Sequence, residues 1–111
     1  MAGANIHTFT DANFEAEVVK SSQPVLVDFW AEWCMPCRML TPTIEALADQ
    51  FAGKVKVGKL DTDANRQVSV KMGISAIPTV FLFKDGQIVR RFVGLTKKDD
   101  LAAALTEVSS K

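Results

Sequence analysis

Cys34 and Cys37 are the only cysteines in the chain of 111 residues, and two residues separate them. Side chains at positions i and i+3 of a helix lie on one face, so this pair can close into a disulfide and reopen with little backbone movement. An apolar run precedes the pair and a helical pattern of apolar residues follows it. The spacing therefore favours a dithiol that cycles between reduced and oxidised states.

Cys34 is the expected nucleophile because it falls at the N-terminus of the predicted helix. Unpaired backbone N–H groups and the positive end of the helix dipole favour a thiolate at that position. Pro36 falls within the first turn, where it has no intrahelical hydrogen bond to break and stiffens the segment between the two sulfurs.

Half of a zinc site and a purely structural disulfide have the same spacing. A closed zinc site needs two more ligands, and outside the pair the chain offers only His7 beside its carboxylates. A disulfide that closes so short a loop restricts the unfolded chain much less than a long loop does. We therefore favour a redox-active pair with no bound metal.

Composition limits the class of protein. The length and the 48% hydrophobic content predict a single domain over residues 1–111. The 13 basic and 13 acidic side chains balance, so neither a nucleic acid nor an anionic membrane is an expected partner. The first residues lack the pattern of an export signal and no run reaches membrane-spanning length, so we expect a cytoplasmic protein.

Apolar patterning predicts nine elements. Strands are expected at 6–9, 25–31, 55–60, 80–83 and 88–93, the last two joined by a hairpin turn at Asp85-Gly86. Helices are expected around 14–18, from Cys34 to Phe51, around 68–72 and around 101–108. The order β-α-β-α-β-α-β-β-α predicts an α/β fold with a mixed five-stranded sheet and helices on both faces.

Some local features of these helices are also predicted. Thr10 or Asp11 is the expected N-cap of the first helix, and Thr96 with Asp99 resembles a capping box for the last helix. Pro42 lies inside the helix that follows the cysteines, where the loss of a backbone hydrogen bond predicts a bend.

The motifs Val27-Asp28-Phe29-Trp30-Ala31-Glu32-Trp33-Cys34-x-Pro36-Cys37, Ile77-Pro78-Thr79, Lys84-Asp85-Gly86 and Gly94 occur in this order. With them, the chain resembles the thioredoxin family over about residues 6 to 108, and Lys59 and Pro42 also stand at the family's relative positions. The resemblance implies the thioredoxin fold and the reduction of disulfides in partner proteins. Met35 departs from the family's usual Cys-Gly-Pro-Cys. It either alters the redox poise or is a tolerated surface variant.

Asp28 is an acid in a strand otherwise built for burial, so desolvation should raise its pKa. The resemblance implies that Asp28 lies behind Cys37 and helps to move that thiol's proton, while Lys59 modulates Asp28. Two plainer interpretations remain. Asp28 could be a buried acid satisfied by hydrogen bonds, and Lys59 could reach into solvent.

The resemblance also implies a docking surface around Cys34. In the family the proline at Pro78 follows a cis peptide bond, and the backbone at Ile77 pairs with an extended substrate segment. An ordinary turn proline is the alternative. The expected substrate-binding residues are Trp33, Met35, Pro36, Ile77, Pro78, Gly94 and Leu95.

The sequence contains no nucleotide-binding fingerprint, so no cofactor is expected to bind. The resemblance implies electrons from NADPH through a flavin-containing thioredoxin reductase. The expected partners are that reductase and disulfide-containing proteins, and the chain is expected to be a monomer. A disulfide-forming oxidant or isomerase, and a non-catalytic binding module, are the competing functions.

Overall fold

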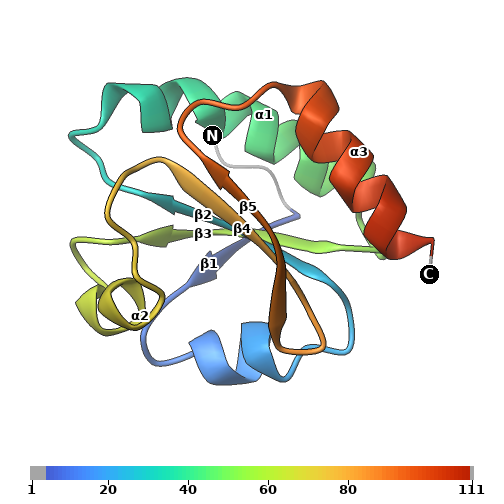
Figure 1. Cartoon of the computed structure of the whole chain (residues 1–111), viewed down its shortest axis with the longest axis horizontal. Coiled ribbons are helices and arrows are strands. Elements are labelled where there is room, and N and C mark those ends of the chain that lie inside the picture. The colour runs from blue at the N-terminus through green and yellow to red at the C-terminus, as the bar shows by residue number, and fades with distance from the viewer. Residues whose placement is uncertain (1–4, 111) are drawn as a thin grey trace.

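A computed structural model describes residues 5–110 of the chain. Within them the elements are β1 (Ile6–Phe9), η1 (Glu15–Val19), β2 (Val25–Trp30), α1 (Met35–Gln50), β3 (Lys56–Asp61), α2 (Arg66–Lys71), β4 (Thr79–Lys84), β5 (Gln87–Val93) and α3 (Lys98–Ser109) (Figure 1). The predicted order of five strands and four helices is confirmed for the described residues. The first helical segment, η1, is a π-helix.

The strands form one mixed sheet in the order β1-β3-β2-β4-β5. β3 pairs in parallel with β1 and β2, while β4 runs antiparallel to both β2 and β5. β2 is central, and all its residues except Trp30 are buried, as its run of apolar residues on both sides of Asp28 predicts. The antiparallel pairing of β2 and β4 brings the start of β4 to the end of β2.

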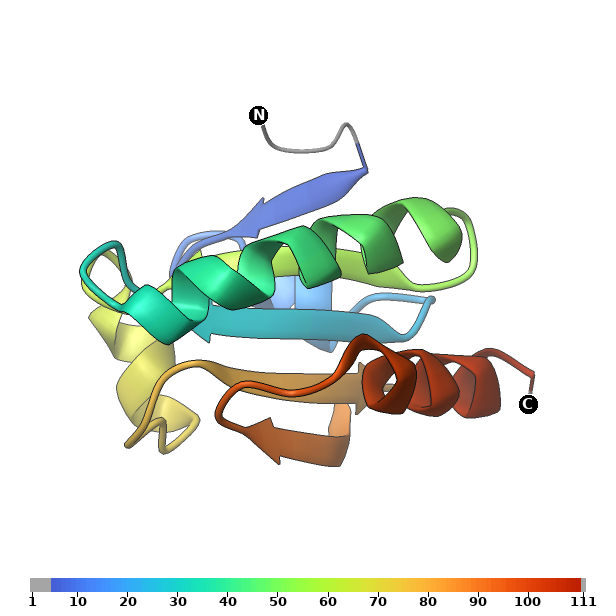
Figure 2. The ribbon, with the colours of Figure 1, turned by 90° about the horizontal axis from the view of Figure 1, so that it is seen from above.

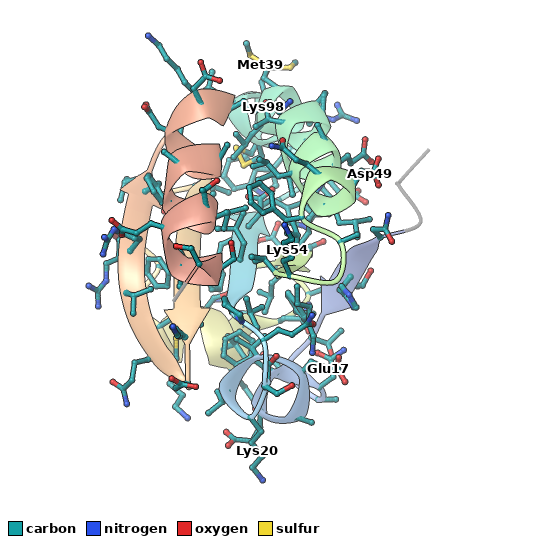
Figure 3. All side chains as sticks on the ribbon, turned by 90° about the vertical axis from the view of Figure 1, so that its right-hand side faces the viewer. Glu17, Lys20, Met39, Asp49, Lys54 and Lys98 are labelled. Carbon is teal, nitrogen blue, oxygen red and sulfur yellow. A yellow bond between two sulfur atoms is a disulfide. The ribbon has the colours of Figure 1, made fainter. Side chains whose placement is uncertain are left out.

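Helices cover both faces of the sheet. α1 and α3 lie on one face, and η1 and α2 lie on the other (Figures 1 and 2). Figure 3 shows the same division, with Asp49 on α1 and Lys98 on α3 on one side and Glu17 and Lys20 at η1 on the other. Each face has its own apolar cluster, so the sheet is the middle layer of the core.

α1 is the longest helix in the described chain and begins directly after Cys34. Its apolar residues Leu40, Ile44 and Leu47 recur four and three residues apart and are fully buried against the sheet. The helix continues through Pro42 without interruption. The buried face of α1 thus anchors the helix on the sheet, and its N-terminus carries the cysteines.

Two of the predicted helix caps are wrong. Asp11 does not cap the first helix: its carboxylate accepts hydrogen bonds from the backbone N–H groups of Gln67 and Val68, at the start of α2. Thr96 does not form a capping box, because α3 starts after Lys97 and the Thr96 hydroxyl donates to the Gly94 carbonyl instead. Sequence spacing could not distinguish these partners, since several polar groups compete for each helix end.

Thr10 makes the local contacts expected near a helix start. Its backbone N–H donates to Oδ1 of Asn13 at 2.7 Å, and its hydroxyl accepts from the Asn13 N–H at 3.1 Å. Phe14 and Val18 are both buried, as predicted. The chain thus turns from β1 into η1 through a reciprocal pair of hydrogen bonds.

The hairpin and one close strand contact depend on glycine. Asp85 and Gly86 have φ values of 53° and 78°, the left-handed conformation that a tight hairpin turn requires. A Cβ on Gly58 would lie 2.5 Å from the ring of Phe9, so β1 and β3 pack closely only because this residue is glycine. Among the residues that the structure describes, no helix has the length and apolar character needed to span a bilayer.

Candidate active site

The carboxyl end of β2 gathers segments from four parts of the chain. Thr79 of β4 lies opposite Phe29 near the end of β2, which places the preceding Pro78 at that edge. The N–H of Gly94, directly after β5, donates to the Pro78 carbonyl at 2.8 Å. The N–H of Thr62, directly after β3, donates to the Trp30 carbonyl at 2.9 Å. The cysteines therefore follow β2 into a site built from the ends of neighbouring strands.

Cys34 and Cys37 form a disulfide at the start of α1. Cys34 is the N-cap of the helix, and its Sγ accepts a hydrogen bond from the Cys37 N–H at 3.3 Å. Cys34 is 4% exposed and Cys37 is 0% exposed, so the first sulfur is the more accessible one. The helix terminus thus directs a backbone donor at the sulfur expected to be the nucleophile.

The peptide bond between Ile77 and Pro78 is cis, as the resemblance implies. The Ile77 carbonyl oxygen lies 3.8 Å from the Cys34 Sγ, so this turn contacts the disulfide directly. Gly94 has a φ of 87°, a conformation that favours glycine. The turn at Pro78 and the segment after β5 thus meet beside the accessible sulfur.

Apolar side chains are exposed at this edge. Trp33 is 72% exposed, Met35 is 63% exposed and Leu95 is 53% exposed. The indole N–H of Trp33 donates a 2.8 Å hydrogen bond to Oδ2 of Asp63, which fixes one side of the ring. The structure therefore brings the predicted substrate-binding residues to one end of the sheet, in the loops that follow β2 and β5 or precede β4 and in the first turn of α1.

The sequence did not identify the cavity next to the disulfide. It has a volume of about 410 Å³ and is lined by Trp33, Thr62, Ile74, Ser75, Ala76 and Ile77. Residues 74–76 link α2 to Pro78 and show no apolar periodicity, so no sequence signal assigned them a role. Asp63, the partner of Trp33, was also not predicted.

Asp28 lies inside the sheet layer on β2. It is 0% exposed, and neither of its carboxylate oxygens has a hydrogen-bond partner among the described residues. Burial raises the pKa of Asp28 from 3.8 to about 7, and the positive charge of Lys59 partly opposes this rise. For the alternative in which hydrogen bonds satisfy this buried acid, the described residues supply no partner.

Lys59 lies opposite Asp28 on β3, the neighbouring parallel strand. Its Nζ donates a 2.8 Å hydrogen bond to the Thr41 hydroxyl and lies 4.1 Å from the centroid of the Trp30 ring. Lys59 is half-buried, and the hydrogen bond to Thr41 holds its ammonium group against α1. The ammonium thus contacts Thr41 and the Trp30 ring rather than extending freely into solvent.

Comparisons with known proteins agree with this geometry. The thioredoxin family model matches residues 5–107. Thioredoxin 1 of Synechococcus elongatus is 52% identical over 96 residues, which cover 86% of this chain and 90% of the relative. Thioredoxin of Rickettsia bellii is 55% identical, covering 83% and 88%. Thioredoxin of Pseudomonas aeruginosa is 48% identical, covering 91% and 94%.

Fold, disulfide position and similarity over most of the chain lead to one assignment. The mixed sheet places a Cys-x-x-Cys pair at the N-terminus of α1, and the family model matches the chain from β1 almost to the end of α3. The predicted function, a protein-disulfide reductase that works through this pair, is confirmed at this level. The chain belongs to the thioredoxin family and is a thiol–disulfide oxidoreductase whose redox-active disulfide joins Cys34 and Cys37.

Proposed function

We propose that Cys34 attacks disulfides of partner proteins and that Cys37 resolves the resulting mixed disulfide. The single observation that carries this order is the difference between the two sulfurs. Cys34 caps α1 and accepts the Cys37 N–H, while Cys37 is fully buried. A thiolate is the reactive form of cysteine, and a helix N-terminus favours it.

The exchange balances in two steps. The Cys34 thiolate forms a bond to one sulfur of the partner's disulfide, the partner's S–S bond breaks, and its other sulfur leaves as a thiolate that takes up a proton. Cys37 then loses its proton and attacks the Cys34 sulfur, the bond between Cys34 and the partner breaks, and the second partner sulfur leaves as a thiolate that also takes up a proton. The partner gains two electrons and two protons, and the chain ends with the Cys34–Cys37 disulfide.

Asp28 is the proposed acceptor of the Cys37 proton. Its carboxylate is buried without a hydrogen-bond partner among residues 5–110, and burial raises its pKa to about 7. A carboxylate with this pKa can accept a proton near neutral pH, whereas an ordinary aspartate is a poor base there. The positive charge of Lys59, the residue opposite Asp28 on the neighbouring strand, lowers the pKa of Asp28 and so modulates its strength as a base.

The proposed docking surface surrounds Cys34. Its exposed apolar members Trp33, Met35 and Leu95 can bury apolar side chains of a partner protein. An extended partner segment would pair with the backbone at Ile77, as an added strand pairs with a sheet edge. Pro36, Pro78 and Gly94 complete the surface, since they shape the backbone beside the sulfur.

The proposed electron donor is a flavin-containing, NADPH-dependent thioredoxin reductase. The oxidised chain must regain two electrons before another cycle, and similarity to named thioredoxins supports a reductase and disulfide-containing substrate proteins as partners. We propose that the chain acts as a monomeric single domain in the cytoplasm. A reducing compartment favours the dithiol form that starts the cycle.

An insulin-reduction assay with dithiothreitol tests the assignment of Cys34. The native chain should accelerate precipitation of the insulin B chain, and Cys34→Ser should abolish the acceleration. Cys37→Ser should instead trap a mixed disulfide through Cys34. Equal rates for the native chain and Cys34→Ser would contradict the proposal.

A separate kinetic test addresses Asp28. In stopped-flow experiments, Asp28→Asn should slow the resolution of the mixed disulfide more than its formation, because only the Cys37 attack uses the base. A slowed first attack with unchanged resolution would remove Asp28 from the proposed role. The reduction potential measured against glutathione distinguishes a reductase from a disulfide-forming oxidant.

A further inference from the structure

The position of the Lys59 ammonium is unexpected for a lysine opposite a buried acid. Asp28 and Lys59 are register partners on adjacent parallel strands, so their side chains project from the same face of the sheet. Among the described residues, ion pairs within 4.0 Å join Lys56 to Glu17 and Arg90 to Glu107, and none joins Lys59 to Asp28. Both Asp28 oxygens remain without a hydrogen-bond partner in the same part of the chain.

The Lys59 ammonium is bound to Thr41 instead. Its Nζ donates to the Thr41 hydroxyl at 2.8 Å, a distance typical of a strong hydrogen bond. The same hydroxyl donates its proton to the Cys37 carbonyl at 3.2 Å, one turn earlier in α1. The Cys37 contact alone is an ordinary bond of a helical threonine to its i−4 carbonyl. It orients the oxygen lone pairs of Thr41 so that they can accept from Lys59.

We propose that Thr41 is a positioning residue that holds the Lys59 ammonium out of ion-pairing distance from Asp28. This inference deepens the proposed function, because Asp28 is the proposed base of the resolving step. An ammonium that moved into contact with a carboxylate would stabilise the ionised acid and weaken it as a base. By engaging Lys59, Thr41 preserves the basicity of Asp28 while keeping a positive charge nearby.

The groups around this arrangement can be named. Thr41, Lys59 and Trp30 line a cavity together with three other titratable groups, His7, Glu45 and Asp61. The β4 partner of Asp28 is Val80, which carries no charge. The buried residues of α3 are apolar, and Cys37 on α1 titrates only when the disulfide is reduced. Lys59 is thus the charged group whose position relative to Asp28 depends on its hydrogen bond to Thr41.

The experiment is a carboxyl ¹³C NMR titration of Asp28 in the oxidised protein, where neither cysteine titrates. Thr41→Val keeps the side-chain shape but removes the hydroxyl, so Lys59 should move toward Asp28 and lower the pKa of Asp28 by about half a unit or more, a threefold change in proton affinity. Thr41→Ser keeps a hydroxyl and should restore the native titration. Thr41→Ala is the second hydroxyl-free variant if Thr41→Val does not fold.

Lys59→Met provides the control for a general disturbance of α1. With no ammonium to release, adding Thr41→Val to Lys59→Met should leave the pKa of Asp28 unchanged. An unchanged or raised pKa in Thr41→Val, or the same fall in the Lys59→Met background, would overturn the proposal.

A kinetic readout separates this proposal from the proposed function. The pH midpoint of mixed-disulfide resolution should fall in Thr41→Val by the same amount as the Asp28 pKa. If the Asp28 pKa falls while the pH profile of resolution stays fixed, Thr41 positions Lys59 as proposed and Asp28 is not the base. The two ideas can therefore fail independently.

Discussion

The indole N–H of Trp33 donates a 2.8 Å hydrogen bond to Oδ2 of Asp63, which joins the loop before α1 to the loop after β3. Trp33 is 72% exposed, so this bond holds a large apolar ring on the surface beside the disulfide. Asp63→Ala should raise the KM for insulin about fivefold and leave kcat unchanged, because the loss of this exposed hydrogen bond costs roughly 1 kcal/mol. Asp49→Ala, at the far end of α1, is the matched control and should leave both constants unchanged.

Asp28 should make the protein less stable as the pH rises. Burial raises its pKa from 3.8 to about 7, so the folded protein binds more protons than the unfolded chain between these values. The free energy of unfolding contributed by this group is therefore greatest below pH 3.8 and is lost as the pH rises to about 7, by about 4 kcal/mol in total.

Asp28→Asn removes this dependence and should be more stable than the native chain at pH 8. Urea unfolding of both proteins from pH 4 to pH 8 measures the effect as a difference in free energy that grows with pH. A constant difference across this range would show that Asp28 does not titrate as its burial implies.

Met35→Gly should make the disulfide easier to reduce. Met35 follows Cys34 directly, and its apolar side chain reduces the hydration of a thiolate at that sulfur. With glycine, the equilibrium constant with glutathione should move about threefold toward the dithiol, about 15 mV for a two-electron couple. Met39→Ala is the control, since Met39 is 60% exposed one turn further along α1 (Figure 3). Identical potentials for all three proteins would show that Met35 is a neutral variant.

Asp11→Ala should destabilise the protein through α2. The Asp11 carboxylate accepts from the Val68 N–H at 2.9 Å and from the Gln67 N–H at 3.3 Å, so its loss leaves two helix donors without a partner. The cost should be about 1–2 kcal/mol in urea unfolding, as for the loss of a helix cap. Asp99→Ala is the comparison, because Asp99 takes no part in a side-chain cap of α3 and should cost less.

Local patterns in the sequence predicted most of the architecture. The run at Val25–Trp30, apolar except for Asp28, marks a strand buried on both faces, and the four- and three-residue spacing of Leu40, Ile44 and Leu47 marks a helix packed on it. The junction between them fixes the position of the cysteines. Asp85-Gly86 likewise indicated the hairpin, because these two residues readily adopt the left-handed conformation that its tight turn requires.

Contacts between distant residues could not be predicted in the same way. Asp11 lies 56 and 57 positions from its partners in α2, and nothing near Asp11 distinguishes this role from a local cap. In the sequence Thr41 looks like an ordinary helical residue, and only the packing of α1 on β3 brings it into contact with Lys59. The cavity beside Trp33 is formed by a loop without periodicity. These features depend on tertiary packing, so they become visible only in three dimensions.

The acidity of the Cys34 thiol tests the central claim most directly. The rate of alkylation by iodoacetamide should be measured against pH in Cys37→Ser, which leaves Cys34 as the single thiol, and in Cys34→Ser, which leaves Cys37. The account predicts a midpoint for Cys34 at least about one unit below the value of roughly 8.5 for free cysteine, and a higher midpoint for Cys37. A Cys34 midpoint at or above that of free cysteine, or a more acidic Cys37, would contradict it.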